Sequence, residues 1–360
     1  MAKNKTENKK SAVELFGEII RHPLFIPVLA LAILVIYNLL KDPSFFAIRF
    51  EGGKLMGNPI SILDFGSELA LLAMGMTLVT AATGGQDISV GANIVIASSV
   101  ILTVLDGNGV NPGTLVIGLL AACVVCMIFG AFNGMLVAQF KIQPMIATLI
   151  LFTAGRDIGR LLSGGTSPRT ESSMVLSIGS YIEGIPVPTP LIITIICIVI
   201  MFLVLKFTTL GLYTQAIGIN ESSSRLNGIN PKLMKIVTFI ILGLCVAIAG
   251  FIKVGRTGTV DYDTTALNIE MDAILAVAIG GNALSGGKFN MGASLLGAYV
   301  IQFLMTTLNN SQIDSRAFPA YKALVVVALV VLSAPVVREK LNGLGKKLKP
   351  KKKVEVKEVG

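Results

Sequence analysis

The chain has 360 residues, of which 53% are hydrophobic and only 14% are charged, and its mean hydropathy is +0.77. A soluble core cannot hold that much apolar surface, so the composition excludes a soluble globular protein and indicates a polytopic membrane protein. The net charge of +9 does not point to nucleic acid, because Lys and Arg gather at residues 3–10 and 340–357, beside the first and last apolar segments. Basic residues in these places are typical of cytoplasmic anchors.

The amino-terminal region, residues 1–22, is basic and then amphipathic, and we expect it to stay in the cytoplasm. The first apolar run lacks the small-residue cleavage site of a signal peptide, so the sequence predicts a retained helix. His22 is the only histidine. One histidine forms neither a metal cluster nor a Ser-His-Asp arrangement, so we expect no metal, no cofactor and no enzymatic activity.

Ten stretches approach the roughly 20 apolar residues that a bilayer crossing needs. They are residues 24–40, 62–82, 88–105, 114–138, 144–162, 191–205, 235–254, 272–284, 291–308 and 321–337. The sequence therefore predicts an all-α fold of about ten transmembrane helices, with a transmembrane domain over residues 23–338 and a basic cytoplasmic tail over 339–360. The positive-inside rule places both termini in the cytoplasm.

Two glycine motifs each end one apolar run and open another: GGQDISVG at residues 84–91 and GGNALSGG at residues 280–287. Such motifs break helices and expose backbone polar groups, which a membrane tolerates where protein or a water-filled path covers them. We expect both to border a path for a polar solute. Asp87 and Ser89 have a second interpretation, as caps of the helix that follows, and both roles can hold together.

Several polar residues lie inside the predicted spans, where their cost favours a functional role. Glu68, Arg156, Asp157 and Arg160 fall near the external ends of their segments. For these four, interfacial snorkelling is the favoured interpretation. Asn133 lies deep in the fourth segment, so its amide must find partners on other helices, and we place it near the path.

The longest internal loop covers residues 207–234 and is named the coupling loop here. It contains a pattern typical of a short capped helix, with Asn220 as the N-cap and Gly228 as the stop. A short helix on the cytoplasmic face is suited to dock a partner. The chain itself lacks a phosphate-binding loop, since the candidate ending in Gly287-Lys288 has Asn282 and Phe289 where such a loop needs Gly and Ser or Thr.

The chain resembles the permease subunits of bacterial ATP-binding cassette sugar importers of the ribose, xylose, arabinose and galactoside type. The resemblance covers about residues 54–337. The matching stretches, in order, are residues 74–79 with 83–91, 132–134 with 142–149, 216–220 with 228–230, and 271–274 with 280–281 and 285–287. Residues 53–63, 141–144 and 287–290 and Ile219 are most similar to the galactofuranose branch. Gln86, Met145 and the Ser222-Ser223 pair depart from the usual family pattern.

The resemblance implies a core of two permeases, with a heterodimer favoured over a homodimer, two cytoplasmic ATP-binding subunits and an external sugar-binding protein. ATP-driven closure of the ATPases would push on the coupling loop and switch access between the two sides. For the translocation path we expect Thr83, Gly84, Gly85, Gln86, Asp87, Ser89, Gly91, Asn133, Gly280, Gly281, Asn282 and Ser285. For ATPase coupling we expect Gly218, Asn220, Ser222, Arg225 and Gly228.

The alternative is an ion-coupled secondary transporter of a small polar solute, motivated by the broken helices and Asp87. A membrane-bound enzyme would need acid–base or metal pairs facing one cavity, and the sequence offers none. The identity of the sugar stays open among pentoses, hexoses, galactofuranose and nucleosides. The four cysteines all lie in apolar segments, where small buried side chains are favoured over a disulfide or metal site.

Overall fold

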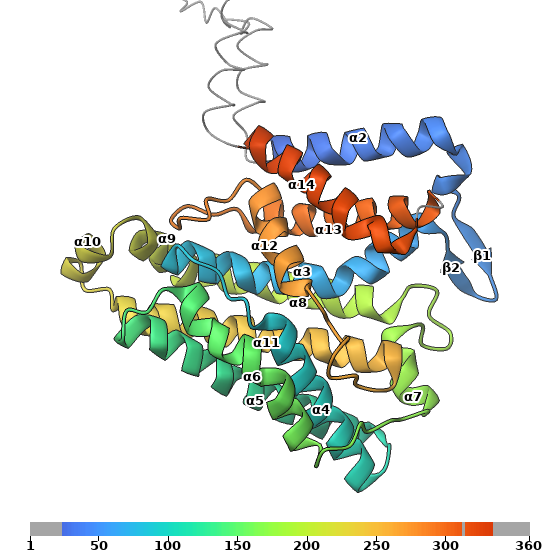
Figure 1. Cartoon of the computed structure of the whole chain (residues 1–360), viewed down its shortest axis with the longest axis horizontal. Helices are drawn as coiled ribbons and strands as arrows, with labels where there is room; N and C mark the ends of the chain where they lie inside the picture. Colours follow the sequence, from blue (N-terminus) through green and yellow to red (C-terminus); the bar gives the residue numbers. More distant parts are fainter. Residues whose placement is uncertain (1–23, 312–313, 334–360) are drawn as a thin grey trace, which may run out of the picture.

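A computed structural model describes residues 24–311 and 314–333. Most helices run along the long axis of the molecule, with α9 and α10 at one end and the β1–β2 hairpin at the other (Figure 1). The main helices are α2 (Phe25–Lys41), α3 (Asn58–Thr83), α4 (Val90–Asn108), α5 (Pro112–Gln139), α6 (Pro144–Leu162), α8 (Thr189–Phe207), α11 (Pro231–Thr257), α12 (Ile269–Ile279), α13 (Met291–Asn310) and α14 (Phe318–Ser333). The short elements are η1 (Pro43–Phe46), β1 (Arg49–Glu51), β2 (Lys54–Met56), α7 (Ser173–Leu176), η2 (Ser177–Gly179), α9 (Leu210–Ile219), α10 (Glu221–Leu226) and η3 (Ser315–Ala317).

Each of the ten predicted apolar segments falls on one of these helices, the tenth as far as the described residue 333. Six helices are long and apolar enough to cross a membrane: α3, α4, α5, α8, α11 and α13. The helical, polytopic character is thereby confirmed. The eighth segment, predicted over 272–284, is helical only over Ile269–Ile279, because the chain leaves the helix at the second glycine motif. Residues 1–22 and 339–360, and with them the predicted cytoplasmic termini, lie outside the described residues.

The sequence analysis missed one piece of sheet. Strands β1 and β2 form an antiparallel hairpin in which Phe50 pairs with Leu55. Gly52 and Gly53 make its two-residue turn with φ of 58° and 78°. Paired positive φ values are what a tight hairpin turn needs, and glycine supplies them without steric cost.

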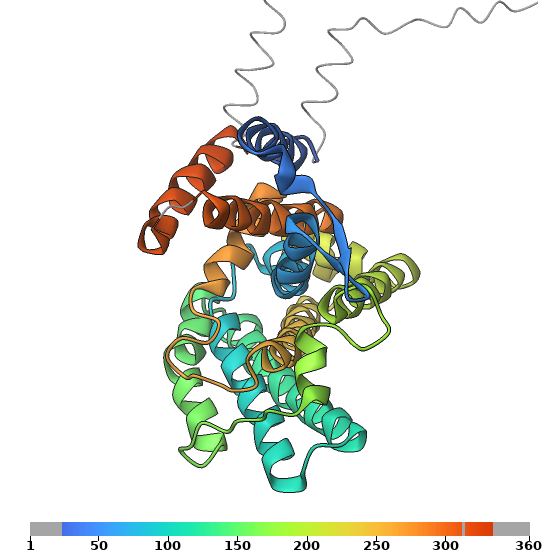
Figure 2. The same ribbon diagram turned by 90° about the vertical axis from the view of Figure 1, so that its right-hand side faces the viewer.

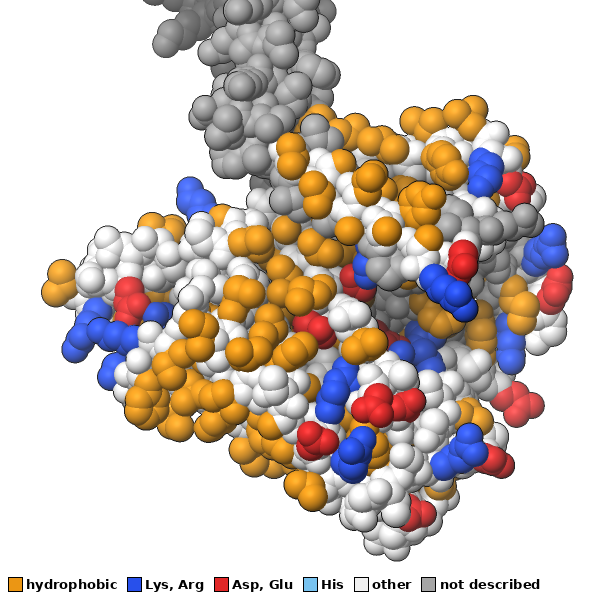
Figure 3. Space-filling model, viewed as in Figure 1, with side chains coloured by type: hydrophobic (Ala, Val, Ile, Leu, Met, Phe, Trp, Pro, Cys, Tyr) orange, Lys and Arg blue, Asp and Glu red, His pale blue; other side chains and the backbone are white. Residues whose placement is uncertain are grey.

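Burial separates a central helix from lipid-facing ones. In α3, 83% of the most apolar 18-residue window is buried, against 17% in α8. The view of Figure 2 has α3 between α2 and α13 on one side and α4, α5, α6 and α11 on the other. Apolar side chains cover much of the surface in Figure 3, whereas charged ones gather toward the ends. Exposed apolar helices such as α8 are stable where the surrounding medium is hydrocarbon.

Small residues set the closest helix packing. Gly243 on α11 lies against the backbone of Cys126 on α5, and Gly130 on α5 lies against the backbone of Phe239 on α11. Without a hydrophobic driving force inside a membrane, close backbone approach supplies much of the helix–helix attraction. Cys126 and Cys245 are buried free thiols, as the sequence analysis expected for small apolar side chains, and Cys197 is partly exposed.

Candidate translocation and coupling site

The two glycine motifs meet in space although they are almost 200 residues apart in the chain. Helix α3 ends at Thr83, and the loop after α12 returns beside that end before α13 begins. The Gly287 amide donates to the Ala81 carbonyl at 2.9 Å. The Gln86 amide nitrogen donates to the Leu284 carbonyl at 3.1 Å. These two hydrogen bonds join the motifs into one unit.

The unit is closely packed and leaves no room for side chains at its centre. Gly84 ends α3 with φ of 65°, and a Cβ atom there would stand 2.6 Å from the Ser285 carbonyl oxygen. Gly218, on α9 of the coupling loop, lies directly against the Ala81 carbonyl and the Gly287 amide. We call Ala81, Gly84, Gly218, Ser285 and Gly287 the glycine junction. It places the coupling loop in direct contact with the end of α3 and with the second motif.

Asp87 is the centre of a buried polar cluster beside the junction. Its carboxylate accepts from the Ser89 amide at 2.7 Å, from the Ser89 hydroxyl at 2.6 Å and from the Asn133 amide at 3.3 Å. The Asn133 nitrogen also donates to the Ser89 hydroxyl oxygen at 3.0 Å, and so does Asn93 at 3.1 Å. The Asn133 side-chain nitrogen therefore has the partners on another segment that its position demanded, whereas its buried amide oxygen has none in the described chain. All partners of Asp87 in the described chain are neutral.

The predicted cap is built differently from the expectation. Ser89 holds the N-cap position of α4, but its side chain makes no capping hydrogen bond to the first turn. The hydroxyl group instead bonds to the Asp87 carboxyl oxygen, which lies only two residues away. Asp87 thus fixes the loop ahead of α4, and the prediction that Ser89 caps the helix was wrong.

The remaining predicted path residues serve packing and local turns. Gly91 lets the Glu270 carboxylate and the Ala266 carbonyl approach α4, and Gly85 lies against Pro144. Asn282 donates to the Ser294 hydroxyl at 2.6 Å and accepts from the Asn290 amide at 2.6 Å, which closes the loop ahead of α13. Further members are placed as follows: Gly280 lies against the Ala293 and Ser294 backbone, Gly281 has φ of 73°, and the Thr83 hydroxyl bonds to the Val79 carbonyl at 2.8 Å.

The coupling loop has the predicted capped helix. Helix α10 begins after Asn220, whose side chain accepts from the Ser223 amide at 2.9 Å. Gly228 follows with φ of 81°. Ser222 and Arg225 are exposed and line a cavity of about 570 Å³, the inner cavity. Thr83 and Gly84 from the first motif reach the same cavity, together with Lys141 and Lys235.

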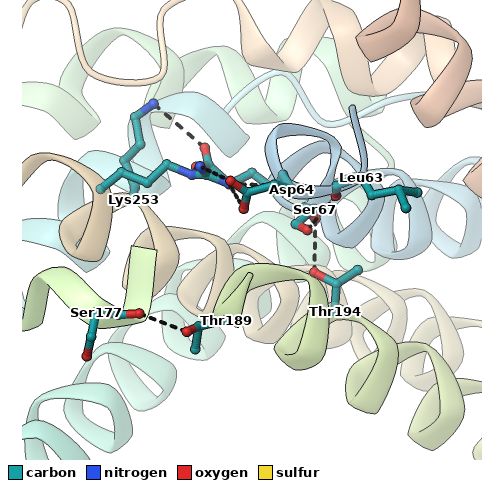
Figure 4. Close-up of polar contacts among 9 residues, drawn as sticks. Leu63, Asp64, Ser67, Ser177, Thr189, Thr194 and Lys253 are labelled. Carbon is teal, nitrogen blue, oxygen red and sulfur yellow. Dashed lines mark hydrogen bonds and ion pairs between the residues drawn. The ribbon is translucent and has the colours of Figure 1, made fainter. Parts of the chain in front are cut away.

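A buried charge cluster at the opposite end escaped the sequence analysis. Arg256 on α11 donates to the Glu68 carboxylate at 2.8 Å and pairs with Asp64 at 3.1 Å, and Lys253 lies 3.7 Å from Glu68. Figure 4 shows Asp64 and Lys253 on facing helices, joined through this network. The Glu68 side chain is only 8% exposed. The snorkelling interpretation of Glu68 was therefore wrong, since it is paired inside the protein.

The sequence did hold a signal for this cluster. Positions 64 and 68 are four residues apart and positions 253 and 256 are three apart, which puts each pair on one helix face. Opposite charges on two such faces predict a pairing between spans.

The other charged residues of the predicted spans lie on α6. Arg156 donates to the Tyr262 carbonyl at 2.7 Å and the Thr265 carbonyl at 3.1 Å, so it holds the loop that precedes α12. Asp157 and Arg160 are exposed and 3.6 Å apart. In the same loop, hydrogen bonds from the Thr264 hydroxyl and the Asp263 amide lower the pKa of Asp261 below its usual value.

Comparison with known proteins places this geometry in a family. Residues 58–334 match the family described as the branched-chain amino acid transport system permease component. The match spans every helix that carries the glycine junction and the coupling loop. The chain belongs to this family. It is a transport permease subunit, a multi-pass protein of the bacterial cytoplasmic membrane, and not an enzyme.

Individual relatives match nearly end to end. The galactofuranose transporter permease protein YtfT of Escherichia coli is 38% identical over 315 residues, which is 87% of this chain and 91% of the relative. The fructose import permease protein FruF of Bifidobacterium longum is 33% identical over 334 residues, 90% of each chain. The ribose import permease protein RbsC of Escherichia coli is 32% identical over 315 residues, 87% of this chain and 92% of the relative. No solved structure matches the chain significantly.

Proposed function

We propose that this permease is the membrane-spanning subunit of an ATP-driven importer for a neutral monosaccharide. Ten helices, with both termini in the cytoplasm, would carry the sugar inward. The relatives named above carry galactofuranose, fructose and ribose in their names, and these names favour a sugar over the amino acids in the family description. The similarity to the galactofuranose relative makes galactofuranose or galactose the first sugar to test, with ribose next.

One observation carries the coupling part of the proposal. Gly218 of the coupling loop contacts the Ala81 carbonyl, at the end of α3, and the Gly287 amide, in the loop after α12. A push on α9 and α10 would therefore reach the end of α3 directly, and α12 through the loop that follows it. Packed helices can shift between two discrete arrangements, and such a shift would change the side of the membrane from which the path is open.

Two ATP-binding subunits would supply that push from the cytoplasm, and an external binding protein would supply the sugar. A second permease would complete the path, as a heterodimer by the galactofuranose resemblance or as a homodimer. The inner cavity has three basic side chains, Lys141, Arg225 and Lys235, of which Lys235 is paired with Glu221 at 2.6 Å. This leaves positive charge available for acidic groups of an ATP-binding subunit.

Reconstitution tests the proposal directly. Proteoliposomes that hold the permease, its ATP-binding subunit and its binding protein should take up labelled galactose or ribose only when ATP is inside. Omission of any one component should abolish uptake, and leucine should not compete. ATP-independent uptake, or competition by leucine but not by sugars, would overturn the proposal.

The second candidate, an ion-coupled transporter, is favoured by one observation. Asp87 is buried and has only neutral partners in the described chain, and a lone buried carboxylate is a common proton or cation relay. Asp87→Asn keeps the acceptor oxygen for Ser89 but removes the charge, whereas Asp87→Ala removes both. If Asp87 only holds the loop, Asp87→Asn retains ATP-driven uptake and Asp87→Ala destabilises the protein by about 1–3 kcal/mol. Loss of uptake in a stable Asp87→Asn variant would favour the relay.

A further inference from the structure

A second cavity opens at the end of the molecule away from the coupling loop. This outer cavity has a volume of about 500 Å³ and lies between the ends of α3, α11 and α13 and the start of α12. Ligand pockets for small molecules occupy about 300–1,000 Å³. None of the predicted path residues lines it. The hollow drawn in Figure 3 is bordered by acidic and basic side chains.

Its ionic groups are balanced. Glu68, Lys253, Arg256 and Asp272 line the cavity. Arg256 pairs with Glu68 and Asp64, as described above, and Lys322 on α14 pairs with Asp272 at 2.6 Å. With the partners Asp64 and Lys322 counted, the cavity's ionic groups are three acids and three bases. A charged ligand would have to break one of these pairs. A neutral ligand would not, because it can accept and donate hydrogen bonds while the pairs stay intact.

Uncommitted amides lie on one wall of the cavity. Gln302, Asn309 and Asn310 on α13 line it, and their side-chain amides make no hydrogen bond to the described part of the chain. Each amide offers two donor hydrogens and an acceptor oxygen. Such groups, spaced along one helix, match the alternating donors and acceptors of a polyhydroxylated ligand.

An aromatic ring completes the lining. Phe65 is 53% exposed, and the Arg256 guanidinium lies 4.5 Å from its ring centre. A ligand site usually combines an apolar or aromatic wall with a few placed polar groups, so that both faces of an amphipathic ligand are met. A monosaccharide has this character, with C–H groups on one face and hydroxyl groups around its edge.

We infer that the outer cavity is a binding site for a neutral monosaccharide, occupied before the sugar passes toward the glycine junction. The inference rests on the proposed function, because it assigns the place where that function's substrate first binds the permease. Gln302, Asn309 and the Glu68–Lys253 pair are its hydrogen-bonding groups. Binding is weak, since the cavity is open and must release its ligand.

The natural chain contains no Trp, so a single introduced tryptophan reports on the cavity without background. Phe65→Trp puts that reporter on the cavity wall. Titration of the purified Phe65→Trp permease with D-galactose, D-ribose and D-fructose should give a saturable fluorescence change with at least one of the three. D-Glucuronate, which carries a carboxylate, should give none at the same concentrations.

A second substitution in the same background tests the amides. Gln302→Ala should weaken the fluorescence midpoint about fivefold, the effect of one lost hydrogen bond. Asn309→Ala, at the exposed end of α13, should weaken the midpoint equally. Because Asn309 is exposed, this variant keeps the test valid if Gln302→Ala fails to fold. Asn108→Ala is the matched control, because Asn108 is an exposed amide at the end of α4, outside the cavity. It should leave the midpoint within about twofold of the parent.

Transport by the reconstituted importer separates this inference from the proposed function. Gln302→Ala and Asn309→Ala should raise the KM for sugar about fivefold, with Asn108→Ala unchanged. If the parent importer takes up sugar but no sugar changes the fluorescence, or glucuronate changes it equally, the cavity inference is overturned and the proposed function stands. If the parent takes up no sugar with ATP, the proposed function itself fails.

Discussion

Gly218 has no side chain, and this lets α9 of the coupling loop approach the backbone of Ala81 and Gly287. Gly218→Ala would put a Cβ atom into the Ala81 carbonyl, which belongs to backbone and cannot rotate away. Overpacking of about 1–3 kcal/mol at a switching contact corresponds to roughly a tenfold change or more in the balance between two arrangements. We expect ATP-driven uptake to fall about tenfold, with ATP hydrolysis partly retained.

The matched control for Gly218 lies on the same short helix. Gly211→Ala on α9 would place its Cβ atom 3.3 Å from the end of the Leu205 side chain, which can shift, and 3.9 Å from the Phe289 ring, an ordinary contact. We expect near-normal uptake from it. Uptake and hydrolysis measured side by side would contradict the coupling role of Gly218 if the two variants behaved alike.

Arg256 pairs with two carboxylates, Asp64 and Glu68, at the end of the molecule away from the coupling loop. Arg256→Met leaves Glu68 and Asp64 buried without their principal counter-charge. Removal of one partner of a buried ion pair costs about 3–5 kcal/mol. We expect a strong loss of thermal stability in detergent, seen as a lower Tm.

Arg160→Met is the comparison for Arg256→Met. Its partners Asp157 and Asp263 are 73% and 86% exposed, and pairs of that kind contribute about 0–1 kcal/mol. The Tm should barely move. Equal shifts in the two variants would contradict the assignment of a buried cluster around Arg256.

At the scale of single elements, the packing of α5 on α11 depends on glycines that admit the facing backbone. Gly243→Ala would push a Cβ atom into the Cys126 carbonyl, whereas Gly118→Ala would stand 3.5 Å from Ile101, an ordinary contact. We expect Gly243→Ala to lower stability by about 1–3 kcal/mol and Gly118→Ala to be near neutral. Thermal unfolding of both variants checks this, and a neutral Gly243→Ala would mean that the two helices separate readily.

Apolar length predicted the helices well because hydrocarbon leaves the backbone few alternatives to a helix. The ends of elements were harder. Helix α12 stops at Ile279, where Gly280 begins the second glycine motif. The position of the loop that follows could not be predicted, because it is held by Ala81 at the end of α3 and by Gln86 in the loop before α4. The β1–β2 hairpin had a local signal in Gly52-Gly53, but its three-residue strands are too short for alternation to be visible.

The candidate site was predicted in parts. The capped α10 could be predicted, because Asn220 and Gly228 act within a few residues of the chain. The meeting of the two glycine motifs and the Asn133 contact with Asp87 depend on tertiary packing, and only the need for partners was visible in the sequence. The outer cavity was missed, since its wall combines residues from four separate helices.

Across the whole molecule, the proposed topology puts the coupling loop inside and the 163–190 segment outside. Ser285→Cys and Glu183→Cys place thiols at exposed positions near the two opposite ends. A membrane-impermeant maleimide added to intact cells should label Glu183→Cys and spare Ser285→Cys until the membrane is opened. The parent chain is the control for background labelling, because Cys123, Cys126 and Cys245 are buried and the partly exposed Cys197 lies within the apolar helix α8. Labelling of Ser285→Cys from outside would reverse the orientation.

The hydrogen bond from Gly287 to Ala81 also bears on the order in which the protein is made. A ribosome completes α9 and α10 before it reaches residue 287, so the nascent polypeptide carries these helices while the Gly287 side of their contact with the glycine junction is still untranslated. Fragments that end before residue 287 would consequently have α9 in contact with Ala81 but without its contact with Gly287. On the proposed coupling, such fragments should compete poorly with the full chain for the ATP-binding subunits.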